Sequence, residues 1–149
     1  MKIILAATPA PGHLDPILSA ARILIEAGHD VLVTTGSIFQ ARIEKAGARF
    51  VRLSGNADLD MSDVDAAFPE RKLLSPGPAQ LRFDFERAFI DTIPDQFSGL
   101  CTILNDFPAD LILADAMFCG TMPLLLGARP TRPAIAGLGV TFLPFHRDD

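Results

Sequence analysis

The stretch KIILAATPAPGHLDP, residues 2–16, decides the fold of this chain. Its first six residues form an almost continuous apolar run, which is typical of a strand buried on both faces of a parallel sheet. A proline-rich loop follows and contains Gly12 and His13. Asp15 and Pro16 then predict the start of a helix, because aspartate caps helices and proline suits their first position. A buried strand that passes through a tight loop into a helix predicts an α/β fold.

The alternation of strand and helix continues along the rest of the chain. Apolar side chains at helical spacing follow Pro16, and Gly28 ends that helix. Further strands are predicted at residues 30–35, 49–53, 111–114 and 133–137, and further helices at 37–46 with Ser37 as cap, at 79–107 with a break at Pro94, and at 118–126. The predicted fold class is α/β, a Rossmann-like doubly wound parallel sheet of five or more strands with right-handed crossovers.

Residues 54–78 interrupt this rhythm with four aspartates and several prolines. We expect a long loop with one short helix, and loops of this length in compact domains are usually functional or mobile. A disordered insertion is the alternative. Asp58, Asp60, Asp63 and Asp65 do not have the spacing of a metal-binding loop, so we expect a solvated acidic segment and no metal site.

Composition limits the classes of partner. The chain has 149 residues, enough for one domain over 1–149, and 49% of them are hydrophobic. The net charge is −5 and no long basic run occurs, which disfavours nucleic acid and anionic membranes as partners. No stretch reaches the roughly 18 apolar residues of a membrane helix, so no stable membrane insertion is expected. Cys101 and Cys119 form no disulfide framework, which favours a reducing, cytoplasmic location.

Two side chains suited to proton transfer follow two of the predicted strands. His13 comes after the first strand and Asp115 after the fourth. In a Rossmann-type strand order 3-2-1-4-5, these strands are neighbours, and ligands bind where the strand order reverses. A carboxylate beside a histidine fixes its tautomer and stabilises the imidazolium, as a general base requires. The alternatives are that His13 is an ordinary loop residue and that Asp115 caps the next helix.

The loop after the first strand excludes other common sites. It contains one glycine, so it lacks the G-x-G-x-x-G pattern of dinucleotide-binding domains, and no cofactor is expected. The chain also lacks the phosphate-binding motif G-x-x-x-x-G-K-[ST] and the nucleophile motif G-x-S-x-G of α/β-hydrolases.

Several motifs together resemble the N-terminal half of glycosyltransferases with the GT-B fold. They are Gly12-His13-x-x-Pro16, the segments 24–31 and 39–48, the strand Asp110 to Asp115, and residues 126–135. The resemblance is to the UDP-glycosyltransferase superfamily and its bacterial branch that modifies macrolides and other natural products. It covers nearly the whole chain and is weakest from Asn56 to Pro78. Nucleotide-sugar epimerases and membrane-associated lipid glycosyltransferases have similar folds and remain alternatives.

The resemblance implies an acceptor-binding domain and roles for its residues. His13 would deprotonate a hydroxyl of a hydrophobic small molecule, Asp115 would orient His13, and the sugar would be transferred with inversion and without a metal. The residues expected to bind the acceptor, with core packing as the alternative for the aromatic and methionine side chains, are Gly12, Phe83, Met117, Phe118 and Phe142.

The resemblance also implies a nucleotide-sugar site in a second, C-terminal domain that these 149 residues do not contain. The chain would then be a fragment of a longer enzyme, a natural half that pairs with a partner chain, or a stand-alone binding module. We expect the isolated chain to be inactive as a transferase, and the exposed surface of its cleft to promote self-association.

Overall fold

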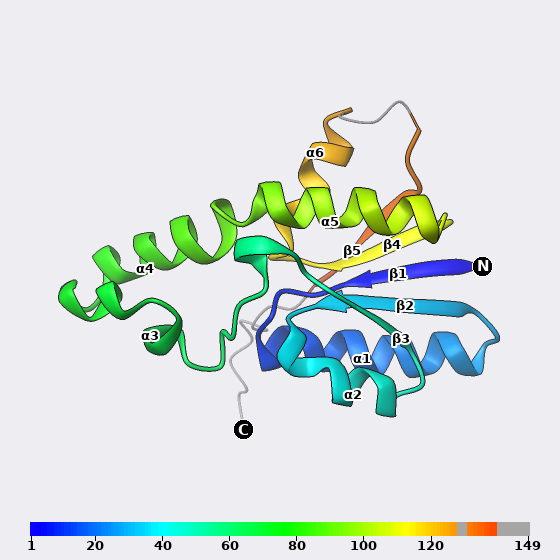
Figure 1. Cartoon of the computed structure of the whole chain (residues 1–149), viewed down its shortest axis with the longest axis horizontal. Helices are drawn as coiled ribbons and strands as arrows, with labels where there is room; N and C mark the ends of the chain where they lie inside the picture. Colours follow the sequence, from blue (N-terminus) through cyan, green and yellow to red (C-terminus); the bar gives the residue numbers. More distant parts are fainter. Residues whose placement is uncertain (128–130, 140–149) are drawn as a thin grey trace, which may run out of the picture.

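A five-stranded parallel sheet forms the centre of the molecule, with the strand order β3-β2-β1-β4-β5 (Figure 1). The computed structural model describes residues 1–127 and 131–139. The strands are β1 Lys2–Ala6, β2 Asp30–Thr35, β3 Arg49–Arg52, β4 Leu111–Asp115 and β5 Ala134–Leu138. The predicted fold class and strand order are therefore confirmed.

The register of β1 places the carboxyl ends of the neighbouring strands side by side. Ala6, the last residue of β1, is paired with Thr34 on β2 and with Ala114 on β4. Parallel strands in this register end at the same edge of the sheet. The segments that follow β1 and β4 therefore leave the sheet as neighbours, at the point where the strand order reverses.

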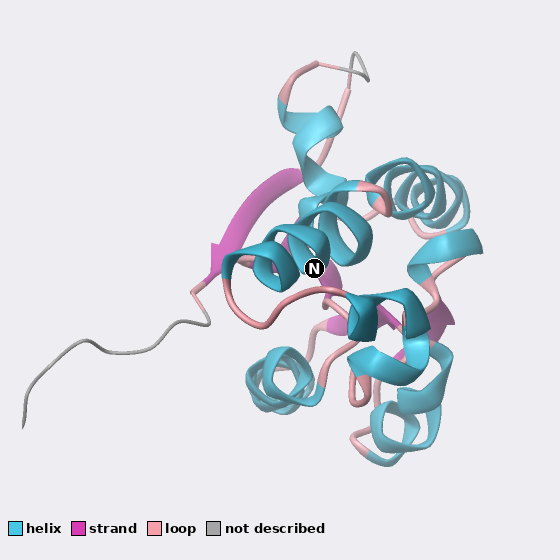
Figure 2. Ribbon diagram, turned by 90° about the vertical axis from the view of Figure 1, so that its left-hand side faces the viewer, coloured by secondary structure: helices cyan, strands magenta, loops and turns pink. Residues whose placement is uncertain are grey.

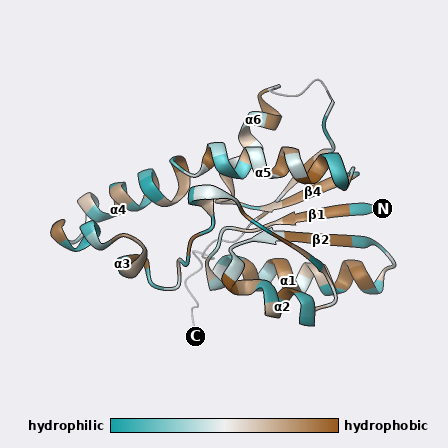
Figure 3. Ribbon diagram, in the orientation of Figure 1, coloured by the Kyte–Doolittle hydropathy of each residue, from teal (hydrophilic) through white to brown (hydrophobic). Residues whose placement is uncertain are grey.

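Helices cover both faces of the sheet (Figures 1 and 2). On one face lie α1, Pro11–Glu26, and α2, Gln40–Lys45, whose apolar residues share a core cluster with alternate residues of β1 and β2. On the other face lies α5, Ile93–Asp106, which contributes Leu100 and Ile103 to a second core cluster. Figure 3 shows hydrophobic residues along the central strands, as expected for a sheet buried on both faces.

Helix α1 begins five residues earlier than the sequence predicts, with Ala10 and Pro11 as cap and first helical residue instead of Asp15 and Pro16. Pro11 occupies the first turn, and the carbonyl of Ala10 accepts bonds from the N–H groups of His13 and Leu14. Pro16 lies inside the helix, where it removes the bond that its own N–H would have donated to the carbonyl of the exposed Gly12. His13 therefore lies on the first helical turn and not in a loop.

Residues 54–92 are ordered into short helices, so the alternative of a disordered insertion is wrong. The elements are a 3-10 turn Gly55–Ala57, α3 Val64–Ala67, a 3-10 turn Pro69–Leu73, α4 Pro78–Asp84 and a π-helical turn Phe85–Ile90. Residues 64–90, here called the arm, extend away from the sheet (Figure 1). The predicted break at Pro94 is confirmed, because α5 begins at Ile93.

Two other predicted helices differ from the structure. Ser37 begins a 3-10 turn, Ser37–Phe39, but its side chain caps nothing. The predicted helix 118–126 is a 3-10 turn, Cys119–Thr121, followed by α6, Met122–Leu125. Among residues 1–127 and 131–139, no helix has the length and apolar character needed to cross a membrane.

Candidate active site

His13 and Asp115 meet at the edge of the sheet where β1 and β4 end. His13 Nδ1 lies 2.9 Å from Asp115 Oδ1. The Asp115 side chain is fully buried, whereas the His13 side chain is 23% exposed. The pair therefore combines a buried carboxylate with an imidazole that solvent or a ligand can reach.

The other hydrogen-bond partners of the Asp115 carboxylate within the described residues are all donors. Thr8 lies two residues after the end of β1. Its backbone N–H and its hydroxyl both donate to the carboxylate. The backbone N–H of Met117 donates to Oδ1 over 2.8 Å. A carboxylate in this setting acts only as an acceptor, so His13 donates its Nδ1–H to it. The Nε2 atom of neutral His13 is then left with a free lone pair.

Of the other described residues predicted to bind an acceptor, Gly12 and Met117 adjoin this pair, whereas Phe83 and Phe118 pack elsewhere. Gly12 is exposed on the first turn of α1, and Met117 is half-buried and contacts Asp115 through its backbone. Phe118 is 2% exposed within the core cluster of the α5 face, so core packing, the alternative, describes its position. Phe83 packs edge-to-face on Phe68, with 5.9 Å between the ring centroids. Phe142 lies outside the described residues.

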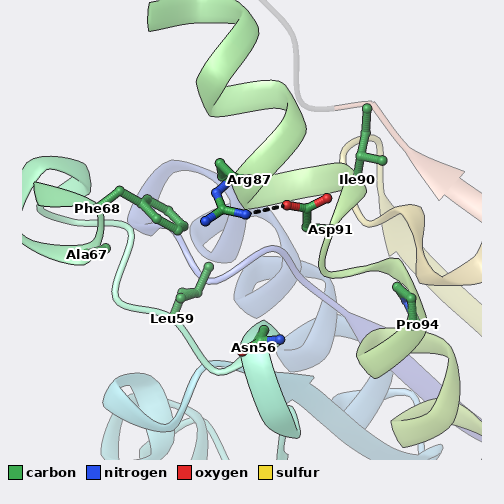
Figure 4. A pocket seen from close by; sticks show the side chains of 8 residues that line it. All are labelled: Asn56, Leu59, Ala67, Phe68, Arg87, Ile90, Asp91 and Pro94. Atoms are coloured by element: carbon green, nitrogen blue, oxygen red, sulfur yellow. Dashed lines mark hydrogen bonds and ion pairs between the residues drawn. The ribbon is translucent and has the colours of Figure 1, made fainter. Parts of the chain in front are cut away.

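A hollow of about 640 Å³ opens between the loop after β3, the arm and the start of α5 (Figure 4). Its walls are formed by Asn56, Leu59, Ala67, Phe68, Arg87, Ile90, Asp91 and Pro94. Arg87 and Asp91 form an ion pair of 3.0 Å on one wall. None of these residues is predicted from the sequence as a site residue. The available signal was weak, because Leu59 and Phe68 are isolated apolar residues in a polar segment.

The wall of this hollow that contains Leu59 is fastened to the loop that leads into His13. The N–H of Met61 donates to the carbonyl of Pro9 over 3.1 Å. Gly36, at the end of β2, lies so close that a Cβ atom there would be 2.8 Å from the Leu59 carbonyl oxygen and 2.8 Å from Pro9 Cβ. Residues 57–61 therefore cross the carboxyl edge of β1 and β2 and place the hollow at the same edge of the sheet as His13.

A smaller hollow of about 230 Å³ lies on the other side of Asp115, between β4, β5 and α6. Cys119 lines it, and burial, together with the negative charge of Asp115, raises the pKa of its thiol. A thiol with a raised pKa remains protonated and is a poor nucleophile or metal ligand. Within the part of the chain that the structure describes, no group of three or more His, Cys, Asp or Glu residues could hold a metal ion.

Comparison with known proteins identifies the relatives of this chain. No protein-family model matches it. It is 32% identical over 135 residues to the UDP-glucosyltransferase B1 of Starmerella bombicola, covering 88% of this chain and 31% of the relative. It is 34% identical over 153 residues to the UDP-glycosyltransferase 2 of Phaeomoniella chlamydospora, covering 99% of this chain and 33% of the relative. The chain is a homologue of the UDP-glycosyltransferases. It spans about a third of the length of these curated relatives.

Solved structures place this UDP-glycosyltransferase homologue in the GT-B fold. The glycosyltransferase SsfS6 of Streptomyces sp. SF2575 aligns with a TM-score of 0.68 at 20% identity, covering 93% of this chain and 39% of that one. CalG4, the calicheamicin glycosyltransferase, aligns with a TM-score of 0.64 at 24% identity, covering 92% of this chain and 32% of that one. The chain therefore has the fold of about one third of a GT-B glycosyltransferase, with relatives from natural-product biosynthesis.

Proposed function

We propose that residues 1–149 form the acceptor-binding domain of an inverting glycosyltransferase. The enzyme would move a sugar from a nucleotide donor to a hydroxyl group of a hydrophobic small molecule. The observation that carries this proposal is the hydrogen bond between His13 and the buried Asp115 at the switch point of the sheet. The relatives, which are named as UDP-glucosyltransferases, support the reaction class.

In the proposed mechanism, His13 is the general base. Its Nε2 takes the proton of the acceptor hydroxyl while Asp115 stabilises the imidazolium that forms. The acceptor oxygen attacks the anomeric carbon as the bond to the nucleoside diphosphate breaks on the opposite face, so the product has inverted configuration.

The hollow beside the arm is the proposed acceptor site. Its apolar walls include Leu59, Phe68 and Ile90, which suit a hydrophobic molecule, and Asn56 offers a polar contact. This site replaces the set of aromatic residues predicted from the sequence, of which Phe118 lies in the core. Phe83 would contribute indirectly, because its ring packs against the ring of Phe68.

The donor is proposed to bind to polypeptide outside these residues. SsfS6 and the spinosyn rhamnosyltransferase SpnG were both solved with thymidine diphosphate, so these structural neighbours bind nucleoside diphosphates. A second domain, either in the same protein or in a partner chain, would hold the nucleotide sugar opposite His13. Bringing the donor and the activated acceptor together accounts for much of the rate gain in such reactions.

The test is a chimaera in which this chain is joined to the donor-binding part of the Starmerella bombicola UDP-glucosyltransferase B1. With UDP-glucose and a phenolic acceptor, His13→Ala is expected to lower turnover by about 10²–10⁴, the usual contribution of a general base. Nucleotide binding, measured by calorimetry, should not change.

His29→Ala is the matched control, because His29 lies before β2, within 3.4 Å of the N-terminal amine and away from the carboxyl edge of the sheet. It is expected to keep full turnover. Near wild-type turnover in His13→Ala would contradict the assignment of His13. A chimaera that binds the phenol and transfers no sugar would instead favour a binding module.

A further inference from the structure

Gln96 is a polar side chain in the core that the proposed mechanism does not use. It lies on α5 and is 1% exposed. Its Nε2 donates to Thr92 Oγ1 over 3.0 Å, and its Oε1 accepts the backbone N–H of Gly120 over 2.7 Å. Burying an amide is costly unless its hydrogen bonds are made, so an apolar side chain would be the simpler filler for this space. The role of Gln96 is therefore to hold its two partners.

The contact between Gln96 and Gly120 is unusually close. A Cβ atom on Gly120 would lie 2.4 Å from Gln96 Cβ and 3.0 Å from Gln96 Oε1, so only glycine fits. Gly120 belongs to the 3-10 turn Cys119–Thr121, and the first N–H groups of a helical turn have no partner within the turn. Gln96 supplies that partner and fastens the turn to α5.

Two backbone N–H groups between Asp115 and the turn Cys119–Thr121 donate hydrogen bonds to Asp115. The N–H of Phe118 donates to the Asp115 carbonyl over 3.1 Å. The N–H of Met117 donates to Asp115 Oδ1, the same oxygen that His13 Nδ1 contacts. Residues 116–120 therefore lie between two fixed points, the Asp115 carboxylate at one end and Gln96 at the other.

The other end of the Gln96 amide is oriented by Thr92. The Thr92 hydroxyl donates to the carbonyl of Ala88 over 3.1 Å, so its lone pairs face the Gln96 amide and select Nε2 instead of Oε1. Thr92 is flanked by Asp91 and, two residues later, by Pro94, and both of these line the hollow beside the arm. Hydrogen bonds and short backbone segments thus alternate between the wall of the proposed acceptor site and Asp115.

We propose that Gln96 is a positioning residue for the His13–Asp115 pair, acting through residues 116–120. Gln96 sets the place of the turn after β4, and the turn directs a backbone N–H at Asp115 Oδ1, so that the carboxylate faces His13 Nδ1. The effect of Gln96 on turnover rests on the proposed function. Its effect on the geometry of the pair does not, and can be measured on this chain alone.

The experiment compares Gln96→Met, which keeps the length and removes both hydrogen bonds, with Gln96→Glu, which keeps an oxygen for Gly120. Nitrogen-15 NMR of the His13 ring reports which ring nitrogen carries the proton in the neutral form. We expect wild type and Gln96→Glu to show a protonated Nδ1 and an unprotonated Nε2. Gln96→Met should lose this preference and show a mixture of the two tautomers.

Thr102→Val is the matched control on the same helix, because the exposed Thr102 hydroxyl donates only to the Ser98 carbonyl. It is expected to leave the His13 signals unchanged. A merely structural role for Gln96 would lower the melting temperature of Gln96→Met while the folded protein kept the wild-type His13 tautomer, and that result would overturn the proposal.

If Gln96→Met does not fold, Thr92→Val provides the test of the proposal. This substitution removes the hydroxyl that orients the Gln96 amide and preserves the shape of the Thr92 side chain. A changed His13 tautomer in folded Thr92→Val supports the proposal, and an unchanged one overturns it. Failure of the chimaera to transfer sugar would contradict the proposed function but would not alter these NMR results.

Discussion

At the scale of single residues, the Asp115 carboxylate is held by donors from two separate segments, Thr8 and Met117, in addition to His13. Asp115→Asn should preserve the fold, because the amide has the same shape. The asparagine side chain would place its NH₂ group among the hydrogen-bond donors that now contact Asp115. The His13 ring would then lose its charged partner and its preferred tautomer. We expect turnover of the chimaera to fall by up to about 10⁴.

Steady-state kinetics and the His13 nitrogen signals both check this prediction. Asp110→Asn is the control, since Asp110 is exposed at the opposite end of β4 and its carboxylate accepts the Lys2 N–H over 2.8 Å, far from His13. Wild-type turnover in Asp115→Asn would mean that Asp115 has only a structural role.

Cys119 provides a pH-dependent prediction at the same scale. Its pKa is raised, first by burial and then by the charge of Asp115, so the folded protein keeps the thiol proton at pH values where the unfolded chain releases it. The resulting stabilisation is complete below pH 9.0, the ordinary value for the thiol, and is lost as pH rises through the raised value.

Urea unfolding of the chain above pH 9.0 should therefore show a steeper loss of stability in wild type than in Cys119→Ala. Cys101→Ala serves as the control and should keep the wild-type slope. Identical slopes for wild type and Cys119→Ala would contradict the prediction.

At the scale of elements, the arm is held together by Arg71. Its guanidinium contacts both carboxylate oxygens of Asp84, over 2.6 and 3.0 Å, and one oxygen of Asp65, over 2.8 Å. These bonds join the 3-10 turn Pro69–Leu73 to α3 and α4. Lysine carries the same charge but cannot make the two-pronged contact.

We therefore expect Arg71→Lys to increase amide hydrogen exchange across residues 64–84 while the exchange of β1 and β4 stays unchanged. Arg82→Lys is the matched control, because Arg82 is 80% exposed and pairs only with Glu86, one helical turn away. Equal protection of the arm in wild type and Arg71→Lys would show that the apolar contact between Phe68 and Phe83 is sufficient.

At the scale of the whole molecule, the proposed base and the proposed acceptor hollow both lie within the described residues, whereas the donor is proposed to bind elsewhere. We expect the 149-residue chain by itself to transfer no sugar, because the reaction needs donor and acceptor held together. The check is an assay of the purified chain with several nucleotide sugars and a phenolic acceptor. Product formed in proportion to the chain, and abolished by His13→Ala, would contradict this expectation.

Much of the architecture was predictable because it depends on neighbours in sequence. Buried strands appear as short apolar runs, and helix ends appear at Gly28 and Pro94. The predicted start of α1 is wrong because Pro11 and Pro16 both suit the first turn of a helix, and the local sequence pattern does not distinguish them. For Phe118 the sequence leaves an acceptor contact and core packing both open, because an aromatic residue after a strand suits a cleft and a core equally well, and the structure places the side chain in a core cluster.

The parallel sheet and, given a Rossmann-type strand order, the arrival of His13 and Asp115 at one edge could be predicted from the sequence alone. Those features follow from local hydrophobic patterns and from the right-handed rule for crossovers, which leave few possible topologies. Only the tertiary structure decided the hollow beside the arm, the donors around Asp115 and the contact between Gln96 and Gly120. Each of these depends on groups from different elements meeting within about 3 Å. Such distances are set by the packing of whole helices, which no short stretch of sequence contains.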